Sequence, residues 1–299
     1  MSALQIVSSQ PFAGRTTVTV AVARGLAAGG AKVRLARHGK GEAADDDALT
    51  FTTFLFASAA EKPVTRMPAA ARGETLIVEI DGGEAPDAKL PALIAVRHEP
   101  ADADKALAAA LGDRLVGSIA TCVNPSAIED VARAMTNGGL RPLALLPEDR
   151  VLAAPCVAEL GATLGARILY AGENEHEVVE DVLIGPVYAD PARPHFRRFA
   201  SKAILAPFNK TDLHLAAIET SAACLIVTGG HEPSPYVIDR AQGEATTILL
   251  SEQDTPGTVA SLADAWSHTR FRGDRKAEAA YAHLEGRVDF ASLVRKLEA

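Results

Sequence analysis

The sequence predicts an α/β protein in which a parallel β-sheet domain is followed by a second, smaller α/β domain. Three observations favour this architecture. Short apolar runs alternate with amphipathic segments along the chain. The runs are almost continuously apolar, as is typical of parallel strands that are covered on both faces. The 299 residues are also too many for one ordinary core and suit about two domains.

The first domain is expected to alternate six strands with helices and loops. The first helix is expected to end at Gly29-Gly30, because glycine commonly follows a helix C-terminus. An acidic run from Glu42 to Asp47 leads into the next helix, since acidic side chains are favourable in a first turn. The expected strands are 4–9, 32–37, 76–81, 93–96, 115–123 and 142–146, and the other helices are 102–111 and 127–137.

A change of composition near residues 188–200 is expected to separate the two domains. This segment contains two prolines and little periodicity, and the α/β alternation restarts after it. We therefore expect domains at 1–190 and 200–299. The expected strands of the second domain are 203–206, 223–227 and 247–250, and its helices are 212–220, 234–242, 255–267 and most of 276–297.

Composition excludes several classes of partner. The net charge of -8 disfavours nucleic acid, because binding to a phosphate backbone needs a concentrated positive surface. No apolar run approaches the roughly 20 residues that span a bilayer, so no membrane association is expected. The three cysteines are widely separated, and the N-terminus shows no secretory signal. These features predict a cytoplasmic protein.

The segment from Ser9 to Thr16 lies close to the phosphate-binding loop pattern G-x-x-x-x-G-K-[ST], with Ser9 for the first glycine and Arg15 for the lysine. It stands between a strand and a helix, where backbone N–H groups face an anion. Arginine keeps the positive charge of the lysine, but its guanidinium group is planar and wide. We therefore expect the loop to bind a nucleotide and to hydrolyse it weakly or not at all. A turn without a ligand is the alternative. The expected nucleotide-binding residues are Pro11, Phe12, Ala13, Gly14, Arg15, Thr16 and Thr17.

Acidic residues are expected to supplement this loop: the run Asp45–Asp47 follows the second strand, and Glu79 and Asp81 end the third. Glu79 stands in an otherwise apolar strand, where an unpaired acid is expensive to bury. Thr16 stands where the loop hydroxyl meets magnesium, and hard cations prefer oxygen ligands. A solvated helix start is the alternative for the acidic run Asp45–Asp47. The expected Mg²⁺ ligands are Thr16, Asp46 and Glu79.

Several stretches together resemble known proteins. Residues 1–187 resemble the dethiobiotin-synthetase-like P-loop proteins, and residues from 200 onward resemble a DRTGG domain. The combination is similar to the N-terminal region of long bacterial phosphotransacetylases. This resemblance implies a P-loop NTPase-like parallel sheet domain followed by a smaller α/β DRTGG-like domain. The stretches that carry it are 8–17, 112–117, 145–152, 182–185, 217–221 and 225–230.

Within the DRTGG resemblance, the Asp-Arg pair of the family is matched by Asn209-Lys210, and Asn209 lacks the charge. The resemblance implies a role in regulation or dimerisation. A turn that needs positive φ is the alternative for Thr228-Gly229-Gly230. The DRTGG-like residues are Asn209, Lys210, Asp212, Thr228, Gly229, Gly230, Asp254 and Thr255.

Our leading hypothesis is a nucleotide-binding regulatory protein. Its P-loop domain would bind ATP or a related nucleotide with Mg²⁺, and its DRTGG-like domain would regulate or form a homodimer, with a protein partner as a further expectation. One alternative is an ATP-dependent ligase of the dethiobiotin-synthetase type that acts on a carboxylate. The other is a non-enzymatic interaction subunit with a vestigial P-loop. No residue is assigned to catalysis, and whether the chain is an enzyme stays open.

Overall fold

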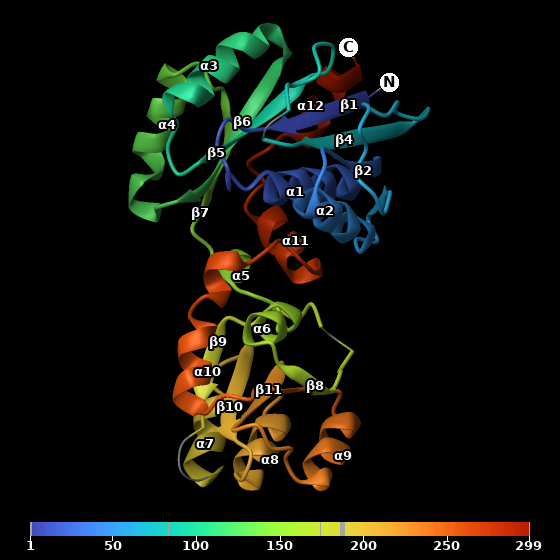
Figure 1. Cartoon of the computed structure of the whole chain (residues 1–299). Helices are drawn as coiled ribbons and strands as arrows, with labels where there is room; N and C mark the ends of the chain where they lie inside the picture. The colour runs from blue at the N-terminus through green and yellow to red at the C-terminus, as the bar shows by residue number, and fades with distance from the viewer. Residues whose placement is uncertain (1, 83, 174, 186–188, 299) are drawn as a thin grey trace. The chain divides into compact units, whose positions relative to one another are not determined.

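The computed structural model describes residues 2–82, 84–173, 175–185 and 189–298 (Figure 1). They form two compact units. The first unit contains the chain up to Leu152 together with the segment from Lys276, and the second unit contains Ala153–Arg275. No helix in the described ranges is long and apolar enough to cross a bilayer.

The first unit is built on a seven-stranded sheet with the order β3-β2-β4-β1-β5-β6-β7. All neighbouring strands in it run parallel. Every residue of β1 and β4 is buried, as expected for strands covered on both faces. The strands are β1 Ser2–Val7, β2 Lys32–His38, β3 Ala57–Ala59, β4 Glu74–Ile80, β5 Ala92–Arg97, β6 Leu115–Val123 and β7 Pro142–Pro147.

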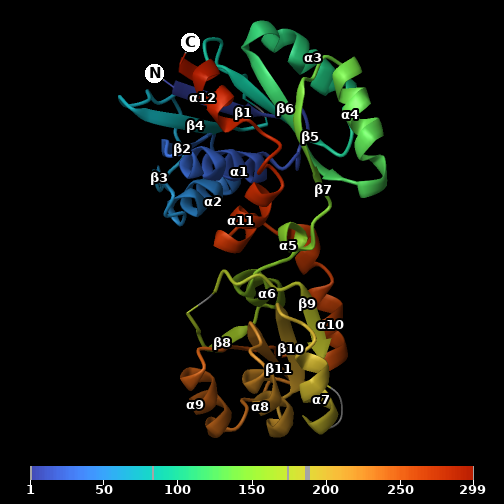
Figure 2. The ribbon, with the colours of Figure 1, turned by 180° about the vertical axis from the view of Figure 1, so that it is seen from behind.

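Helices cover both faces of this sheet (Figures 1 and 2). On one face, apolar residues of β4, β5 and β6 form a core with α3 and α4. On the other, α1 packs on β1, β2 and β4, and α12 packs on β1 and α1. The helices are α1 Arg15–Ala28, α2 Glu42–Thr52, α3 Asp102–Leu111, α4 Ile128–Asn137, α5 Arg150–Ala153, α11 Asp274–Ala282 and α12 Phe290–Glu298.

The contact between α1 and α12 has a specific fit. The ring of Phe290 lies over Gly25, and a Cβ at Gly25 would stand 2.1 Å from the ring. Both Gly25 and the neighbouring Leu26 are buried. The glycine therefore allows the aromatic ring to rest directly on the backbone of α1.

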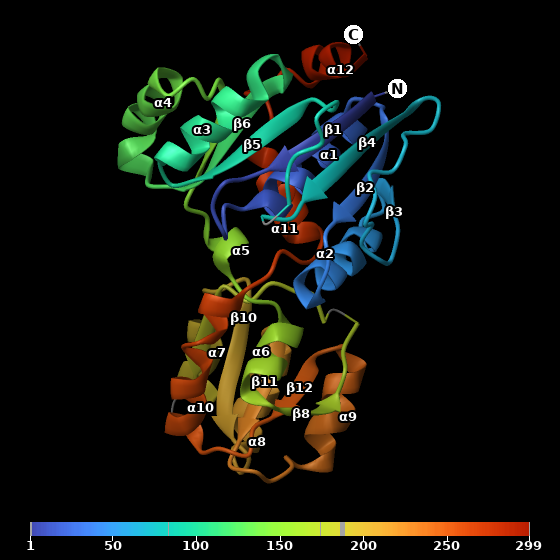
Figure 3. The same cartoon turned by 45° about the horizontal axis from the view of Figure 1, so that its top comes forward.

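The second unit contains a five-stranded sheet with the order β8-β12-β11-β10-β9 (Figure 3). Strand β8 is antiparallel to β12, and the other pairs are parallel. One apolar cluster joins the sheet to α7, α8 and α9, and another joins it to α6 and α10. The elements are α6 Val157–Leu164, β8 Arg167–Tyr170, β9 Asp181–Ile184, α7 Ala189–Phe196, β10 Lys202–Pro207, α8 Thr211–Glu219, β11 Cys224–Thr228, α9 Pro235–Gly243, β12 Thr247–Leu250 and α10 Thr255–Leu262.

These units divide the chain differently from the expected domain ranges, 1–190 and 200–299. Residues 153–185 lie in the second unit, because β8 pairs with β12 and β9 pairs with β10. The segment from Lys276 returns to the first unit, where α12 packs on β1. The second unit is thus inserted into the first.

A candidate anion site at the carboxyl edge of the seven-stranded sheet

The loop between β1 and α1 is shaped by Gly14, which adopts φ +69°. A side chain would be strained in this left-handed conformation, and a Cβ would stand 3.0 Å from Thr121 Oγ1. Thr121 in turn donates a hydrogen bond of 3.1 Å to the carbonyl of Ala13. The helix α1 begins at Arg15 without a side-chain cap. Its first-turn N–H groups are therefore placed at the loop, as in anion-binding helix starts.

The outer part of the loop is fixed by Asp104 of α3, a fully buried acid. Its Oδ1 accepts a hydrogen bond of 2.5 Å from Ser9 Oγ, and its Oδ2 accepts one of 3.0 Å from Gln10 Nε2. Pro11 and Phe12 project from the loop, and Phe12 is 83% exposed. The tip of the loop is thus fully exposed, and residues 8–10 and 14–17 on either side of it are partly exposed.

Glu79 stands under the loop on β4 and is 1% exposed. Its Oε1 accepts a hydrogen bond of 3.1 Å from Thr16 Oγ1, whereas its Oε2 is buried without a hydrogen-bond partner. Burial, with the nearby charge of Asp47, raises the pKa of Glu79 to about 7, against the opposing effect of Arg37 and Arg15. The acid therefore changes its charge near neutral pH.

Arg37 of β2 is the cation beside this acid. Its Nε lies 3.0 Å from Asp47 Oδ2 and 3.6 Å from Glu79 Oε1, and its Nη2 lies 3.3 Å from Asp81 Oδ1. Burial lowers the pKa of Arg37, but the carboxylates outweigh that effect and the net pKa is raised. The guanidinium of Arg37 therefore contacts carboxylates on three segments: Asp47 on α2, Glu79 on β4 and Asp81 just after β4.

Arg15, the residue in the position of the loop lysine, also turns toward these acids. Its Nη1 donates a hydrogen bond of 2.6 Å to Ser8 Oγ. Its Nη2 lies 3.7 Å from Asp81 Oδ1, and its Nε lies 3.8 Å from Glu79 Oε1. The side chain is 15% exposed. Its charge is thus held beneath the loop.

The expected magnesium ligands fit this arrangement only in part. Thr16 and Glu79 are adjacent, and the unpartnered Oε2 of Glu79 is a free oxygen. The residue of the acidic run that bonds to Arg37 is Asp47, while the expected ligand Asp46 lies one position earlier on α2 and is half-buried. In the described ranges, no group of three or more His, Cys, Asp or Glu side chains is arranged to hold a metal ion. Two guanidinium groups already stand beside the acids, so we derive no step that uses a metal here.

Sequence reasoning missed the residues that hold this site together. Ser8, Arg37 and Asp104 were not singled out, although they bond Arg15, Asp47 and the loop. One signal was available, because Arg37 and Glu79 occupy paired positions on adjacent parallel strands. Two opposite charges in apolar strands suggest such a pair, but the pairing depends on the strand order.

The DRTGG-like residues lie at the carboxyl ends of three neighbouring strands in the second unit. Thr228 ends β11, and its hydroxyl lies 2.8 Å from that of Thr255, which begins α10. Asp254 caps α10 by accepting a hydrogen bond of 2.9 Å from the Gly257 N–H. Asn209, Lys210 and Asp212 follow β10, with Lys210 at the start of α8.

Gly229 and Gly230 form a tight turn at this edge. Both have positive φ, +96° and +71°. Their N–H groups donate to the carbonyls of Gln253 and Ser251 at 2.8 and 3.1 Å. The ring of Phe208 stands 3.1 Å from where a Gly229 Cβ would be. These hydrogen bonds occupy the N–H groups of Gly229 and Gly230, which would be the donors to an anion bound at this turn.

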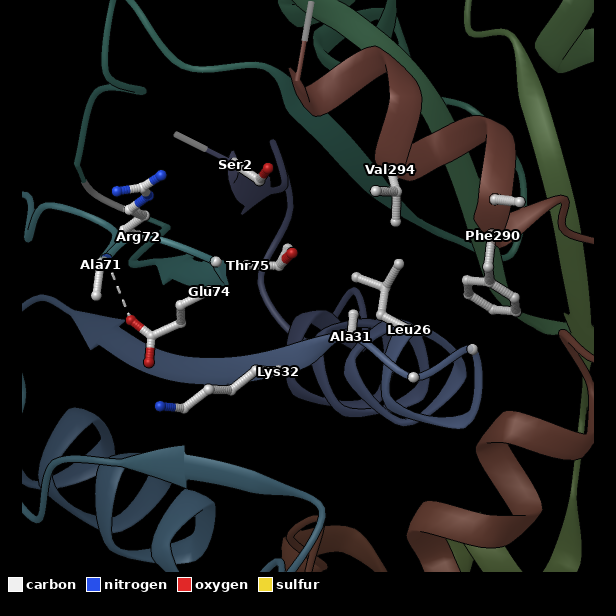
Figure 4. Close-up of a pocket in the computed structure, with 14 residues that line it drawn as sticks. Ser2, Leu26, Ala31, Lys32, Ala71, Arg72, Glu74, Thr75, Phe290 and Val294 are labelled. Atoms are coloured by element: carbon white, nitrogen blue, oxygen red, sulfur yellow. Dashed lines mark hydrogen bonds between the residues drawn. The ribbon is translucent and has the colours of Figure 1, made fainter.

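A separate cavity of about 670 Å³ lies at the opposite edge of the seven-stranded sheet (Figure 4). It is bounded by the amino ends of β1, β2 and β4 and by α12. Leu26, Phe290 and Val294 supply an apolar wall, and Lys32 and Arg72 bring positive charge. Glu74 accepts a hydrogen bond of 3.3 Å from the Ala71 N–H. None of the loop residues 8–17 lines this cavity.

Comparisons with known proteins identify a curated relative. The chain is 26% identical over 170 residues to a phosphate acetyltransferase of Nitratidesulfovibrio vulgaris (strain Hildenborough), a match that covers 52% of this chain and 24% of the relative. The chain therefore spans about a quarter of the length of that relative.

A structural comparison concerns part of the chain. The CBS and DRTGG domains of the regulatory region of Clostridium perfringens pyrophosphatase, solved with the activator diadenosine tetraphosphate, match 38% of this chain and 49% of that chain. The identity is 23% and the TM-score 0.34. The model of the DRTGG domain family matches residues 159–265, within the second unit. The second unit of this α/β protein thus contains a DRTGG domain.

Proposed function

We propose that this chain is a nucleotide-binding regulatory protein. In this proposal the loop 8–17 of the first unit binds the phosphates of ATP or a related nucleotide, with weak or absent hydrolysis. The DRTGG domain of the second unit contributes regulation or self-association. The relationship to a phosphate acetyltransferase covers only a quarter of that protein, so its activity forms no part of the proposal.

The observation that carries the proposal is the geometry around Gly14. Its φ of +69° turns the chain from β1 into α1, a helix of 14 residues whose N-terminus has no side-chain cap. Uncapped N–H groups at a helix start attract anions, and the helix dipole adds to that attraction. Ligands of open α/β sheets also bind beyond the carboxyl ends of the strands, where this loop lies.

The position of Arg15 supports binding without efficient hydrolysis. Phosphoryl transfer needs a cation that follows the β- and γ-phosphates. Here the guanidinium of Arg15 is hydrogen-bonded to Ser8 and lies at ion-pair distance from Asp81 and Glu79. A nucleotide would therefore be held chiefly by backbone N–H groups, and its γ-phosphate would lack the cation that stabilises transfer. The same contacts favour the interaction subunit with a vestigial loop as the second candidate.

Titration calorimetry of the full chain with ATP, alongside a phosphate-release assay, tests this proposal. We expect saturable binding with little release. A Gly14→Asp variant places a carboxylate at the loop and should weaken ATP binding at least about tenfold, which is about 1.4 kcal/mol. Gly30→Asp is the matched control, because Gly30 also has positive φ (+86°) but has open space around it at the far end of α1.

The outcomes separate the hypotheses. Binding that Gly14→Asp weakens and Gly30→Asp leaves intact supports the proposal, provided that thermal melting shows both variants folded. Rapid phosphate release would overturn the expectation of weak hydrolysis, and release only with a carboxylate substrate would identify the ligase. Absence of ATP binding would leave the interaction subunit.

A further inference from the structure

We propose that Arg15 takes the place of the divalent cation at the acids Glu79 and Asp81, so that the loop binds its anion without a metal. This inference rests on the proposed function for the identity of the anion. The contacts that carry it are internal to the first unit.

The guanidinium stands where a cation bridging the loop and the acids would stand. Its Nη1 donates a hydrogen bond of 2.6 Å to Ser8, just after β1. Its Nε and Nη2 lie at ion-pair distances of 3.8 Å from Glu79 in β4 and 3.7 Å from Asp81 after β4, and Nε makes no hydrogen bond. An arginine keeps its charge at every physiological pH. The acids therefore have a permanent positive neighbour that no chelator can remove.

The fork shape of arginine explains why this residue can serve here. A guanidinium presents donors in several directions at once, whereas the ammonium of lysine is a single point. Nη1 reaches Ser8 while Nη2 and Nε face Asp81 and Glu79. A lysine at this position could serve one of these partners but could not span all three.

Packing holds the guanidinium in place. The backbone of Gly82 lies against it, since a Cβ at Gly82 would stand 2.9 Å from Arg15 Nη1. Ser8, its hydrogen-bond partner, also donates to the carbonyl of Gln10 at 2.9 Å and so belongs to the loop itself. Arg15 consequently links the loop to the acids.

Charge opposes the entry of a divalent ion beside Thr16. Arg15 and Arg37 already bring two positive charges to the three carboxyl groups of Glu79, Asp81 and Asp47. An ion bound to Glu79 Oε1 and Thr16 Oγ1 would lie close to both guanidinium groups, since each has its Nε within 3.8 Å of that Oε1. Like charges this close in a buried site repel strongly.

Manganese titration of the free protein, with unbound Mn²⁺ read by electron paramagnetic resonance, tests the inference without any nucleotide. The wild type should show no Mn²⁺ binding that depends on Glu79. Arg15→Ala should create one such site, and Arg15→Ala/Glu79→Gln should lose it. Arg133→Ala is the matched control, because it removes a guanidinium from an exposed pair with Asp130 on α4.

Two results would overturn the inference. One is a Mn²⁺ site in the wild type that Glu79→Gln abolishes, which would mean that the metal fits with Arg15 in place. The other is a folded Arg15→Ala variant that gains no site, which would mean that the arginine is not what excludes the metal.

ATP titration in EDTA and in Mg²⁺ separates this inference from the proposed function. Dissociation constants that agree within about twofold, a difference of about 0.4 kcal/mol, support metal-free binding. ATP binding that requires Mg²⁺ in the wild type would overturn the inference and leave the proposed function standing. Absence of binding in both buffers would overturn the proposed function, and the manganese titration would still decide the role of Arg15.

Discussion

Thr16 Oγ1 and Glu79 Oε1 are joined by a hydrogen bond of 3.1 Å that links the first turn of α1 to the interior of β4. The two residues are 63 positions apart in the sequence. Because Glu79 is 1% exposed, its carboxyl depends on protein groups in place of water. The ionisation of this acid, the position of the loop and the stability of the first unit are therefore coupled.

Replacement of Glu79 by glutamine should make the stability of the first unit less dependent on pH. The folded-state pKa of about 7 lies above the ordinary glutamate pKa of 4.5, so the stabilising contribution of Glu79 is fully present below pH 4.5 and is lost as pH rises through 7. The free energy of unfolding of Glu79→Gln, relative to wild type, should increase by about 2–3 kcal/mol across that window. Urea unfolding followed by circular dichroism at pH 5 and pH 8 measures it. A constant difference between the two pH values would contradict the assignment.

Gly14→Ala should destabilise the first unit by about 1–2 kcal/mol, because φ is +69° and the new methyl group would stand 3.0 Å from Thr121. Gly30→Ala has the same kind of backbone strain at φ +86° but no atom within 4 Å. The difference between the two unfolding free energies isolates the packing of the loop on Thr121. Equal losses would show that this packing is unimportant.

Gly25→Ala should loosen the attachment of α12 to α1. The added methyl would stand 2.1 Å from the Phe290 ring, so the ring must move, at a cost of about 1–3 kcal/mol in unfolding free energy. Gly29→Ala is the control, because its nearest atom would be 3.4 Å away and its φ is -77°. A second change, Phe290→Leu, should restore part of the stability in the double variant. If the double variant is no more stable than Gly25→Ala, the methyl group does not clash with the Phe290 ring.

Lys202→Met should destabilise the second unit by about 1–3 kcal/mol, because buried carbonyl groups would lose their donor. Lys202 is 2% exposed, and its ammonium donates to the carbonyls of Phe199, Thr220 and Ser221. The chain has one tryptophan, Trp266, and it lies in the second unit, so its fluorescence reports the unfolding of that unit. Lys105→Met, at an exposed lysine of α3, should leave this transition unchanged. A wild-type midpoint for Lys202→Met would contradict the prediction.

Much of the architecture could be predicted from local patterns. The strands 115–123 and 247–250 and the helix 102–111 have the expected bounds, and the parallel α/β class is confirmed. Continuous apolar runs and helix-starting acids are local signals, so one sequence suffices to find them. The short strand β3, which has three residues, was missed because it carries too little pattern.

The division into units could not be predicted, because strand character does not tell which sheet a strand joins. The segment 181–184 is a strand, but only its pairing with β10 places it in the second unit. The return of α12 depends equally on a distant contact, the seat of Phe290 on Gly25. The loop pattern indicated Gly14 and Thr16, whereas the direction of the Arg15 side chain follows from Ser8 and Asp81, which lie on other elements.

The packing of the Phe290 ring on Gly25 also determines in which order the two units can be completed while the chain is synthesised. A domain made of contiguous residues can fold as soon as it leaves the ribosome. Here α1 emerges early with its groove at Gly25 open, and the residue that fills this groove follows the whole inserted unit. The inserted unit can therefore complete its own sheet before α12 has been synthesised and has packed on β1 of the seven-stranded sheet. The apolar surface of α1 and β1 that α12 covers is therefore completed only after the whole inserted unit and α12 have been synthesised.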